Sequence, residues 1–331
     1  MTTGLHHDEL IEQASVATGL DDFGDLPLLE PLGVLVESMN REAQLVGPRL
    51  AQAASMIVTT LVKRLRLVND RSRFPGIADE VIKAPLFIVG APRTGSTHLH
   101  ALLAQITDVR APMFWEMTLP SPPPERATRL TDPRIAQIQA AVDQLPEDLL
   151  KRHPIAPLRP EQCNVMMDWS FYNFAWLASY EIPTYRDWLF NADHAPALEA
   201  HRRTLQHLQW KYPGRWVLKY PKHLLNLDAV LDTYPDAGLI WTHRDPAVTI
   251  PSVCSLTGYM RSSEQHRIPS RGPHLDRQPP QNQTWRPRIH PRNVRTHHRR
   301  PPPPLLLLHR PLRHHHYLKP PHSRTTSSEH V

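Results

Sequence analysis

The sequence predicts an α/β protein with a P-loop-like three-layer fold: a central parallel sheet, a helical N-terminal region and a disordered C-terminal tail. After residue 84, short apolar runs typical of buried strands alternate with helical segments, the order of a parallel sheet with helices on both faces. The first 83 residues carry helical apolar spacing, and the last 71 carry no periodic pattern. We therefore divide the chain into a helical region (1–83), an α/β core (84–260) and a low-complexity tail (261–331).

The N-terminal region is predicted to be helical over residues 5–68. Its clearest apolar stripe repeats at spacings of three and four and comprises Leu50, Ala54, Ile57, Leu61 and Leu65. Lys63, Arg64 and Arg66 fall on the opposite side. This pattern indicates a surface helix that packs its apolar stripe on the core and turns its basic residues to solvent.

Three strand-to-helix units build the core. The first begins with the apolar run 84–89, which a glycine-bounded loop and a leucine-rich helical segment follow. The second has a strand at 216–220 and a helix that extends to about residue 234. The third has a strand at 238–242, after which Asp245 is a natural N-cap and Pro246 fits the first helical position.

The formal charge of +6 belongs to the tail. Residues 261–331 hold 14 of the 38 Lys and Arg but 3 of the 32 Asp and Glu, so the tail carries about +11 and the remainder about −5. The tail also contains 13 Pro and 11 His, a composition that cannot bury enough apolar surface to fold. A segment of this charge could bind polyanions without sequence specificity, although no recognisable nucleic-acid module accompanies it.

Cysteine usage and hydropathy predict a cytoplasmic protein. Cys163 and Cys254 are the two cysteines and form no C-x-x-C pair, which favours a reducing compartment. Residues 1–13 are polar, unlike a signal peptide. No run approaches the about 18–20 apolar residues that a membrane span requires.

The loop after the first strand carries the main chemical motif, G-x-x-x-x-G-S-T over residues 90–97. A nucleotide P-loop has lysine where this chain has Ser96, and that lysine reaches the β- and γ-phosphates of a triphosphate. Its absence argues against ATP or GTP hydrolysis and leaves a backbone anion nest at a helix N-terminus. The residues predicted to bind the anion are Gly90, Ala91, Pro92, Arg93, Thr94, Gly95, Ser96 and Thr97.

This loop resembles the 5′-phosphosulfate-binding loop of sulfotransferases that use PAPS (3′-phosphoadenosine 5′-phosphosulfate), and is particularly similar to the bacterial branch common in actinobacteria. A second motif supports the resemblance, because Arg244 follows a strand and Ser252 comes eight residues later, the spacing of the family's 3′-phosphate site. An arginine beside a hydroxyl recognises a phosphate by charge-assisted hydrogen bonds. The resemblance implies PAPS as donor and transfer of a sulfuryl group to a hydroxyl or amine of a small acceptor.

The resemblance also implies catalytic roles. Family members carry a histidine after the second strand as general base on the acceptor hydroxyl, and His223 matches by position. Arg93 and Lys219 would stabilise the charge that grows on the bridging oxygen. No metal is required by this scheme, and the tail histidines at 314–316 could bind one incidentally.

The acceptor is defined only by its expected surroundings. Residues 169–188 are rich in aromatic side chains, some of which we expect to line an apolar pocket that suits a lipid, sterol or phenol. The proline-rich stretch 111–160 is expected to lie over the site, with a short helix near 131–144. Three further polar residues belong to no motif. Glu116 has two open interpretations, a residue that faces the acceptor and, more commonly, a structural one, and His153 and Glu161 have no stronger claim to a role.

The resemblance is expected to end near Met260, where the composition changes abruptly within a predicted helix. A frameshift in a GC-rich gene would produce such a change, and sequencing the locus tests this hypothesis. Two alternative functions stay open from the sequence. One is a different P-loop small-molecule kinase, which would turn over ATP with magnesium; the other is a non-catalytic anion-binding protein with a basic tail.

Overall fold

The centre of the structure, a computed structural model that describes residues 4–265 and 305–308, is a five-stranded parallel sheet. The strand order is β2-β3-β1-β4-β5. The strands are β1 (Leu86–Val89), β2 (Val109–Arg110), β3 (Arg215–Lys219), β4 (Gly238–Thr242) and β5 (Leu305–Leu308). In register, Phe87 of β1 lies between Leu218 of β3 and Leu239 of β4. Because the strands are parallel, their carboxyl ends meet at one edge, where α/β sheets bind ligands.

Helices alternate with these strands, as the sequence predicts. The longer ones are α1 (His7–Thr18), α2 (Leu29–Glu42), α3 (Pro48–Arg73), α4 (Ser96–Leu103), α6 (Pro133–Val142), α10 (Pro183–Asn191), α11 (Ala195–Gln209) and α13 (Pro246–Gln265). The shorter ones are α5 (Phe114–Thr118), α7 (Glu147–Arg152), α8 (Asn164–Met167), α9 (Trp176–Ser179) and α12 (Leu227–Thr233). Single 3₁₀ turns are η1 (Pro75–Ile77), η2 (Asp168–Ser170) and η3 (Pro221–Asn226).

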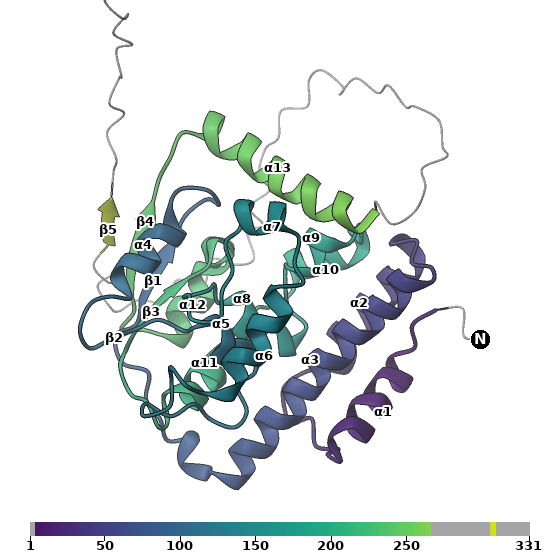
Figure 1. Cartoon of the computed structure of the whole chain (residues 1–331), viewed down its shortest axis with the longest axis horizontal. Coiled ribbons are helices and arrows are strands. Elements are labelled where there is room, and N and C mark those ends of the chain that lie inside the picture. Colours follow the sequence, from purple (N-terminus) through teal and green to yellow (C-terminus); the bar gives the residue numbers. More distant parts are fainter. Residues whose placement is uncertain (1–3, 266–304, 309–331) are drawn as a thin grey trace, which may run out of the picture.

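The sheet is buried on both faces, which confirms the predicted three-layer α/β fold (Figure 1). On one face Ile88 and Val217 pack with Leu99 of α4. On the other, Phe87 and Leu218 join the main core, which α3, α11 and α12 share. Alternate residues of the central strands therefore serve two separate cores, as continuous apolar strand runs require.

The N-terminal helices α1, α2 and α3 lie at the side of the molecule away from the sheet (Figure 1). Ile57, Leu61 and Leu65 of α3 are fully buried, which confirms the predicted apolar stripe. α1 packs along α3, so the helical region covers one flank of the core.

The prediction that Lys63 and Arg64 face solvent was wrong, because both side chains are buried. Arg64 donates hydrogen bonds to the carbonyl oxygens of Phe23 (2.7 Å) and Pro27 (3.2 Å). Lys63 forms an ion pair of 2.9 Å with Asp168. Backbone carbonyls and a carboxylate from other segments thus satisfy the two cations, and helical spacing alone contains no information about such distant partners.

The short helix predicted near 131–144 is α6. Asp132 caps it, since its Oδ1 accepts a hydrogen bond of 2.9 Å from the backbone N–H of Arg134. Pro133 occupies the first helical turn, where no intrahelical donor is needed.

Two described segments differ from the predicted disorder of residues 261–331. Helix α13 continues past Met260 to Gln265 and crosses above α7 and α9 in Figure 1. Residues Leu305–Leu308 form β5 beside β4, where an apolar run supplies backbone partners to a strand that would otherwise be an edge. The other tail residues lie outside the described part of the chain, so the prediction for them is not tested.

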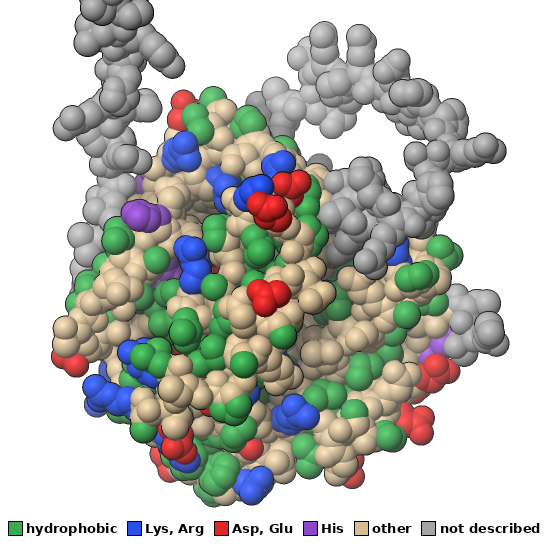
Figure 2. All heavy atoms as spheres, viewed as in Figure 1, with side chains coloured by type: hydrophobic (Ala, Val, Ile, Leu, Met, Phe, Trp, Pro, Cys, Tyr) green, Lys and Arg blue, Asp and Glu red, His purple; other side chains and the backbone are tan. Residues whose placement is uncertain are grey.

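Charges of both signs are interspersed on the face drawn in Figure 2, with apolar side chains between them. Within the described residues, the structure contains no helix with the length and apolar character of a membrane span.

Candidate functional site

The carboxyl ends of β1 and β4 are joined closely at Gly90. This glycine has a φ of +135°, and a Cβ atom there would lie 2.3 Å from the carbonyl oxygen of Thr242. The hydroxyls of Thr94 and Thr242 are 2.6 Å apart, which links the loop to the end of β4 a second time. Only glycine permits both the backbone conformation and the approach.

The loop of residues 90–95 delivers the chain into α4. Gly95 is left-handed, with a φ of +91°, directly before the first helical residue, Ser96. Arg93 also has a positive φ of 69°, a conformation that non-glycine residues rarely adopt and that concentrates at functional sites. The helix begins where the loop ends, so its free backbone N–H groups face the same region as the loop.

The structure brings the two predicted binding motifs together. Arg93 donates from Nε to the Ser252 hydroxyl at 3.0 Å. Arg244 donates from Nη1 to the backbone carbonyl of Arg93 at 3.2 Å. Arg93 and Arg244 are both exposed, so their remaining donors are accessible to a ligand. We call residues 90–97, Arg244 and Ser252 the donor half of the site, after the role that the sequence resemblance predicts for them.

A cavity of about 790 Å³ adjoins this loop. Arg93 and Lys219 line the cavity. Arg244 and Ser252 do not line it, but both make hydrogen bonds with Arg93. Its apolar wall comes from α3, α5, α9, α13 and the segment before α9. The residues of this wall are Met56, Phe114, Phe174, Trp176, Leu177 and Leu256. We call the wall the acceptor half, after the pocket that the sequence predicts. The predicted aromatic contribution from 169–188 is therefore present in the wall.

A chain of polar groups joins the two halves. Lys219, at the end of β3, lies 3.7 Å (Nζ to Oε1) from Glu161. The other Glu161 oxygen lies 3.4 Å from Nε2 of His153. Lys219 and Glu161 are buried and His153 is partly buried, and all three line the cavity.

Burial and charge set the protonation of this chain of groups. Burial by itself would raise the pKa of Glu161, but the hydrogen bond from His153 and the charge of Lys219 outweigh it and lower the pKa to about 2. Burial lowers the pKa of Lys219, and the Glu161 carboxylate opposes that change. Glu161 is thus ionised, and Lys219 releases a proton more readily than a solvated lysine does.

His223, the predicted general base, does not line the cavity. It is buried in η3, where its ring packs edge-on against Phe87 and Tyr220 with centroid separations of 5.3 Å. Burial lowers its pKa to about 3. The two residues before it, Pro221 and Lys222, line the cavity instead. The segment that carries the predicted base therefore borders the cavity, but the His223 side chain does not.

His153 and Glu161 are two polar cavity residues that no sequence motif marks. They lie in the connection between α7 and α8, eight positions apart. This connection is neither helix nor strand, so no periodicity links the two positions. Their partner Lys219 lies 58 positions after Glu161. Glu116, the third residue without a motif, is buried and pairs with Arg110 at 2.8 Å, which is a structural contact.

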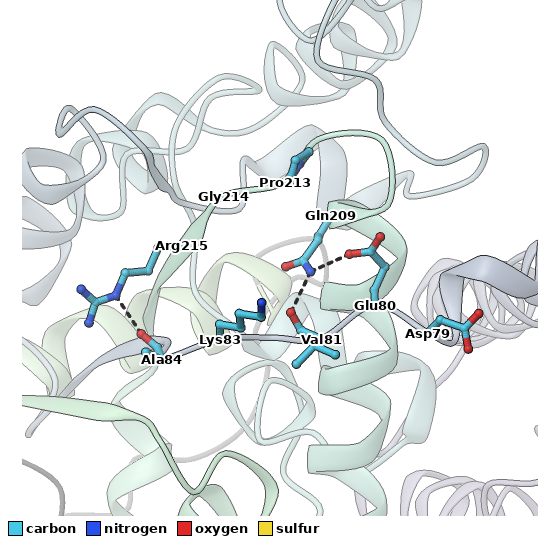
Figure 3. Close-up of a pocket in the computed structure, with 9 residues that line it drawn as sticks. All are labelled: Asp79, Glu80, Val81, Lys83, Ala84, Gln209, Pro213, Gly214 and Arg215. Atoms are coloured by element: carbon cyan, nitrogen blue, oxygen red, sulfur yellow. Dashed lines mark hydrogen bonds between the residues drawn. The ribbon is translucent and has the colours of Figure 1, made fainter.

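A second cavity lies at the opposite, amino edge of the sheet (Figure 3). Gln209 donates there to Glu80 (2.7 Å) and to the carbonyl of Val81 (3.0 Å). Arg215 donates to the carbonyl of Ala84 at 2.9 Å. These polar groups satisfy one another, and the glycine-bounded loop is at the other end of the strands, so we place the functional site at the carboxyl edge.

Comparison with known proteins identifies relatives of this arrangement. The profile described as the sulfotransferase family matches residues 85–300. The expectation that the resemblance ends near Met260 was therefore wrong, and α13 continues through that position. The crystal structure of sulfotransferase STF1 from Mycobacterium tuberculosis H37Rv is 33% identical, with a TM-score of 0.68 over 78% of this chain and 72% of that one. Sulfotransferase STF9 from Mycobacterium avium is 30% identical, with a TM-score of 0.70 over 77% of this chain and 67% of that one.

Among curated proteins, the sequence finds no match. The family profile nevertheless covers more than half of the chain, and both solved structures share its fold across about three quarters of its length. These matches favour the sulfotransferase interpretation over a kinase or a non-catalytic binding protein. The chain belongs to the sulfotransferase family.

Proposed function

We propose that this sulfotransferase transfers a sulfuryl group from PAPS to the hydroxyl of an apolar acceptor. One observation supports this most directly: Arg93 contacts Ser252, receives a hydrogen bond from Arg244 on its carbonyl, and lines a cavity whose far wall is apolar. A donor with two anionic groups and an acceptor without charge suit these two walls.

The residues of the donor half fit PAPS. Its 5′-phosphosulfate would be held by the loop amides, the N-terminus of α4 and Arg93, and its 3′-phosphate by Arg244 and Ser252. The close Gly90–Thr242 approach favours this assignment, because it holds the loop against the end of β4, from which Arg244 contacts the loop. When bound, PAPS supplies the sulfuryl group; the remaining chemistry falls to the protein.

We assign the acceptor proton to His153. Glu161 holds the Nε2 side of its imidazole, which leaves Nδ1 as the proton acceptor, and the ionised carboxylate stabilises the imidazolium that forms. Lys219 is placed to stabilise negative charge on the donor's bridging oxygen, and its desolvated ammonium can give that oxygen a proton. The predicted base role of His223 would require η3 to turn its ring away from Phe87 and toward the cavity.

The acceptor class follows from the wall opposite the loop. Aromatic and aliphatic side chains from α3, α9 and α13 surround a volume of about 790 Å³, which exceeds the needs of a simple short-chain alcohol. We therefore propose a lipid, sterol or phenol alcohol rather than a sugar or a peptide.

Calorimetric binding of adenosine 3′,5′-bisphosphate tests the donor site. Wild-type protein should bind it more tightly than 5′-AMP or ATP. The Arg244→Ala substitution should weaken binding about 10- to 100-fold, since a hydrogen bond to a charged group contributes about 1.5–3 kcal/mol.

The matched control is Arg215→Ala, which removes an exposed arginine at the opposite edge of the sheet and should leave this affinity unchanged. Equal affinity for adenosine 3′,5′-bisphosphate and 5′-AMP in folded protein would refute the 3′-phosphate assignment. The acceptor class is tested separately, by transfer of labelled sulfate to a sterol and to a sugar alcohol, with the two rates compared per hydroxyl group.

We also retain the proposal that the basic tail binds polyanions without sequence specificity. The charge of about +11 in residues 261–331 supports it. Retention on heparin that decreases steeply with salt, and is unaffected by Arg244→Ala, would distinguish this contact from the donor site.

A further inference from the structure

A buried cluster of one cysteine and two histidines lies beneath the cavity and takes no part in the proposed reaction. Cys163 precedes α8, His201 is on α11, and His223 is in η3. One ligand atom of each lies within 4.8 Å of those of the other two. All three side chains are almost completely buried.

Two ring nitrogens of the cluster's histidines have no hydrogen-bond partner among the described residues. Within the described residues, neither Nε2 of His201 nor Nε2 of His223 makes a hydrogen bond. Buried polar atoms without a protein partner are rare in native proteins and are typical of sites that bind a water molecule or an ion. The other nitrogen of His201, Nδ1, lies 2.6 Å from the hydroxyl of Tyr234. This contact fixes the orientation of the ring, as the second hydrogen bond of a metal-ligating histidine does.

We infer that Cys163, His201 and His223 bind a d¹⁰ metal ion, Zn²⁺ or Cu⁺. Thiolate and imidazole are the ligands that these two ions prefer, whereas Mg²⁺ and Ca²⁺ require oxygen ligands. In a zinc site with bonds of about 2.3 Å to sulfur and about 2.0–2.1 Å to nitrogen, the ligand atoms lie roughly 3.4–3.8 Å apart. Atoms separated by up to 4.8 Å would therefore each move inward by at most roughly 0.7 Å.

Metal binding requires neutral imidazoles and a Cys163 thiolate. Burial lowers the pKa of His223 to about 3 and that of His201 well below its usual range, so both imidazoles are neutral and able to ligate. Burial raises the pKa of Cys163 to about 12. The thiol is therefore protonated in the absence of metal, and binding would replace that proton: a sulfur–metal bond forms, and one proton leaves to solvent without any change in oxidation state.

The position of the cluster suggests its role. The backbone N–H of Cys163 donates to the carbonyl of Lys219 at 3.0 Å, and Cys163 lies two residues after Glu161. His223 follows Lys219 by four residues. A metal at this point would join the two segments that present Glu161 and Lys219 to the cavity, so it acts as a structural clamp rather than as a reactant.

Metal content tests the inference without donor or acceptor, so its outcome is independent of the proposed function. Full-length protein is stripped with chelator under reducing conditions and titrated with Zn²⁺ or with Cu⁺. We expect one equivalent of one ion to bind wild type and the Cys254→Ser control, which removes the exposed free cysteine. Cys163→Ser should lose the tight site, with affinity reduced at least 10-fold.

Two further measurements keep the test decisive if Cys163→Ser does not fold. X-ray absorption of metal-loaded wild type should show one sulfur and two nitrogen ligands, and Co²⁺ should give a thiolate charge-transfer band. Joint substitution of His314, His315 and His316 by alanine removes the tail histidines and should leave both signals unchanged. Cu⁺ is distinguished from Zn²⁺ by three-coordinate geometry without a further light-atom ligand.

Folded wild type that takes up neither ion would overturn the inference and leave the three groups as a water-bridged buried cluster. A bound metal without a sulfur ligand, or one that depends on the tail histidines, would also overturn it.

Discussion

The donor and acceptor halves of the site are built by different physical means. The donor half consists of backbone amides, a glycine at a close approach and two exposed arginines, all within two short segments that follow β1 and β4. The acceptor half is an apolar wall assembled from α3, α5, α9 and α13. The first depends on local backbone geometry, and the second depends on how distant helices pack.

This difference implies that the two halves fail separately. Arg244 and Ser252 stand on either side of the turn into α13, whereas Leu256 lies further along the same helix and contributes to the acceptor wall. A change that displaces the later turns of α13 would therefore open the acceptor half while the anion nest persists. The chain of Lys219, Glu161 and His153 lies at the junction, and substitutions there distinguish effects on chemistry from effects on binding.

The largest expected effect is on turnover at that junction. His153→Ala should lower kcat about 100- to 10 000-fold, because a positioned general base contributes that much, and should leave affinity for adenosine 3′,5′-bisphosphate unchanged. His223→Gln is the comparison, and it should lower the thermal midpoint of unfolding while folded protein keeps most of its kcat. Steady-state kinetics and a thermal melt on both variants measure this. The reverse pattern would return the base role to His223.

The donor half was predictable from sequence because each of its motifs is local. Gly90 and Gly95 bound one turn, and Arg244 and Ser252 are eight residues apart on one strand-to-helix connection. The strands and the apolar stripe of α3 were predictable for the same reason, since period and propensity act over a few residues. The family profile and the solved structures support the predicted family and fold around these residues.

The junction was not predictable because its members meet only after folding. His153 and Glu161 lie in an irregular connection between α7 and α8, where no periodicity relates them. Their contact with Lys219, at the end of β3, forms only in the folded chain. His223 shows the opposite case: its place in the motif is local, but its burial against Phe87 depends on the neighbouring strand. Lys63 and Arg64 followed helical spacing yet are buried, because carbonyls and a carboxylate from other segments satisfy them.

The next effect is on the stability of the donor half. Gly90→Ala should cost about 4 kcal/mol, because it combines a strained φ with a Cβ placed 2.3 Å from a backbone oxygen. Gly95→Ala is the matched control: its φ is also positive, but its Cβ would meet nothing within 4 Å, so about 1 kcal/mol is expected. Urea unfolding of the two variants measures the difference. Equal losses would mean that the approach to Thr242 is looser than described.

The smallest expected effect is a pH-dependent one at Glu161. Its folded pKa of about 2 lies below the usual value of 4.5, so its ionised form stabilises the fold above about pH 4.5, and this contribution disappears as pH falls toward 2. The shift corresponds to roughly 3 kcal/mol. The difference in unfolding free energy between wild type and Glu161→Gln should therefore be largest near pH 6 and about half as large near pH 3.

Asp25 provides the control for burial in that measurement. Its pairing with Arg203 also lowers its pKa to about 2, but its side chain is 72% exposed, so solvent screening should hold its contribution below about 1 kcal/mol. Urea unfolding of Asp25→Asn and Glu161→Gln at both pH values compares the two carboxylates directly. If the two variants lose the same unfolding free energy, burial at the junction does not strengthen the interactions of Glu161. Its role would then be limited to positioning His153.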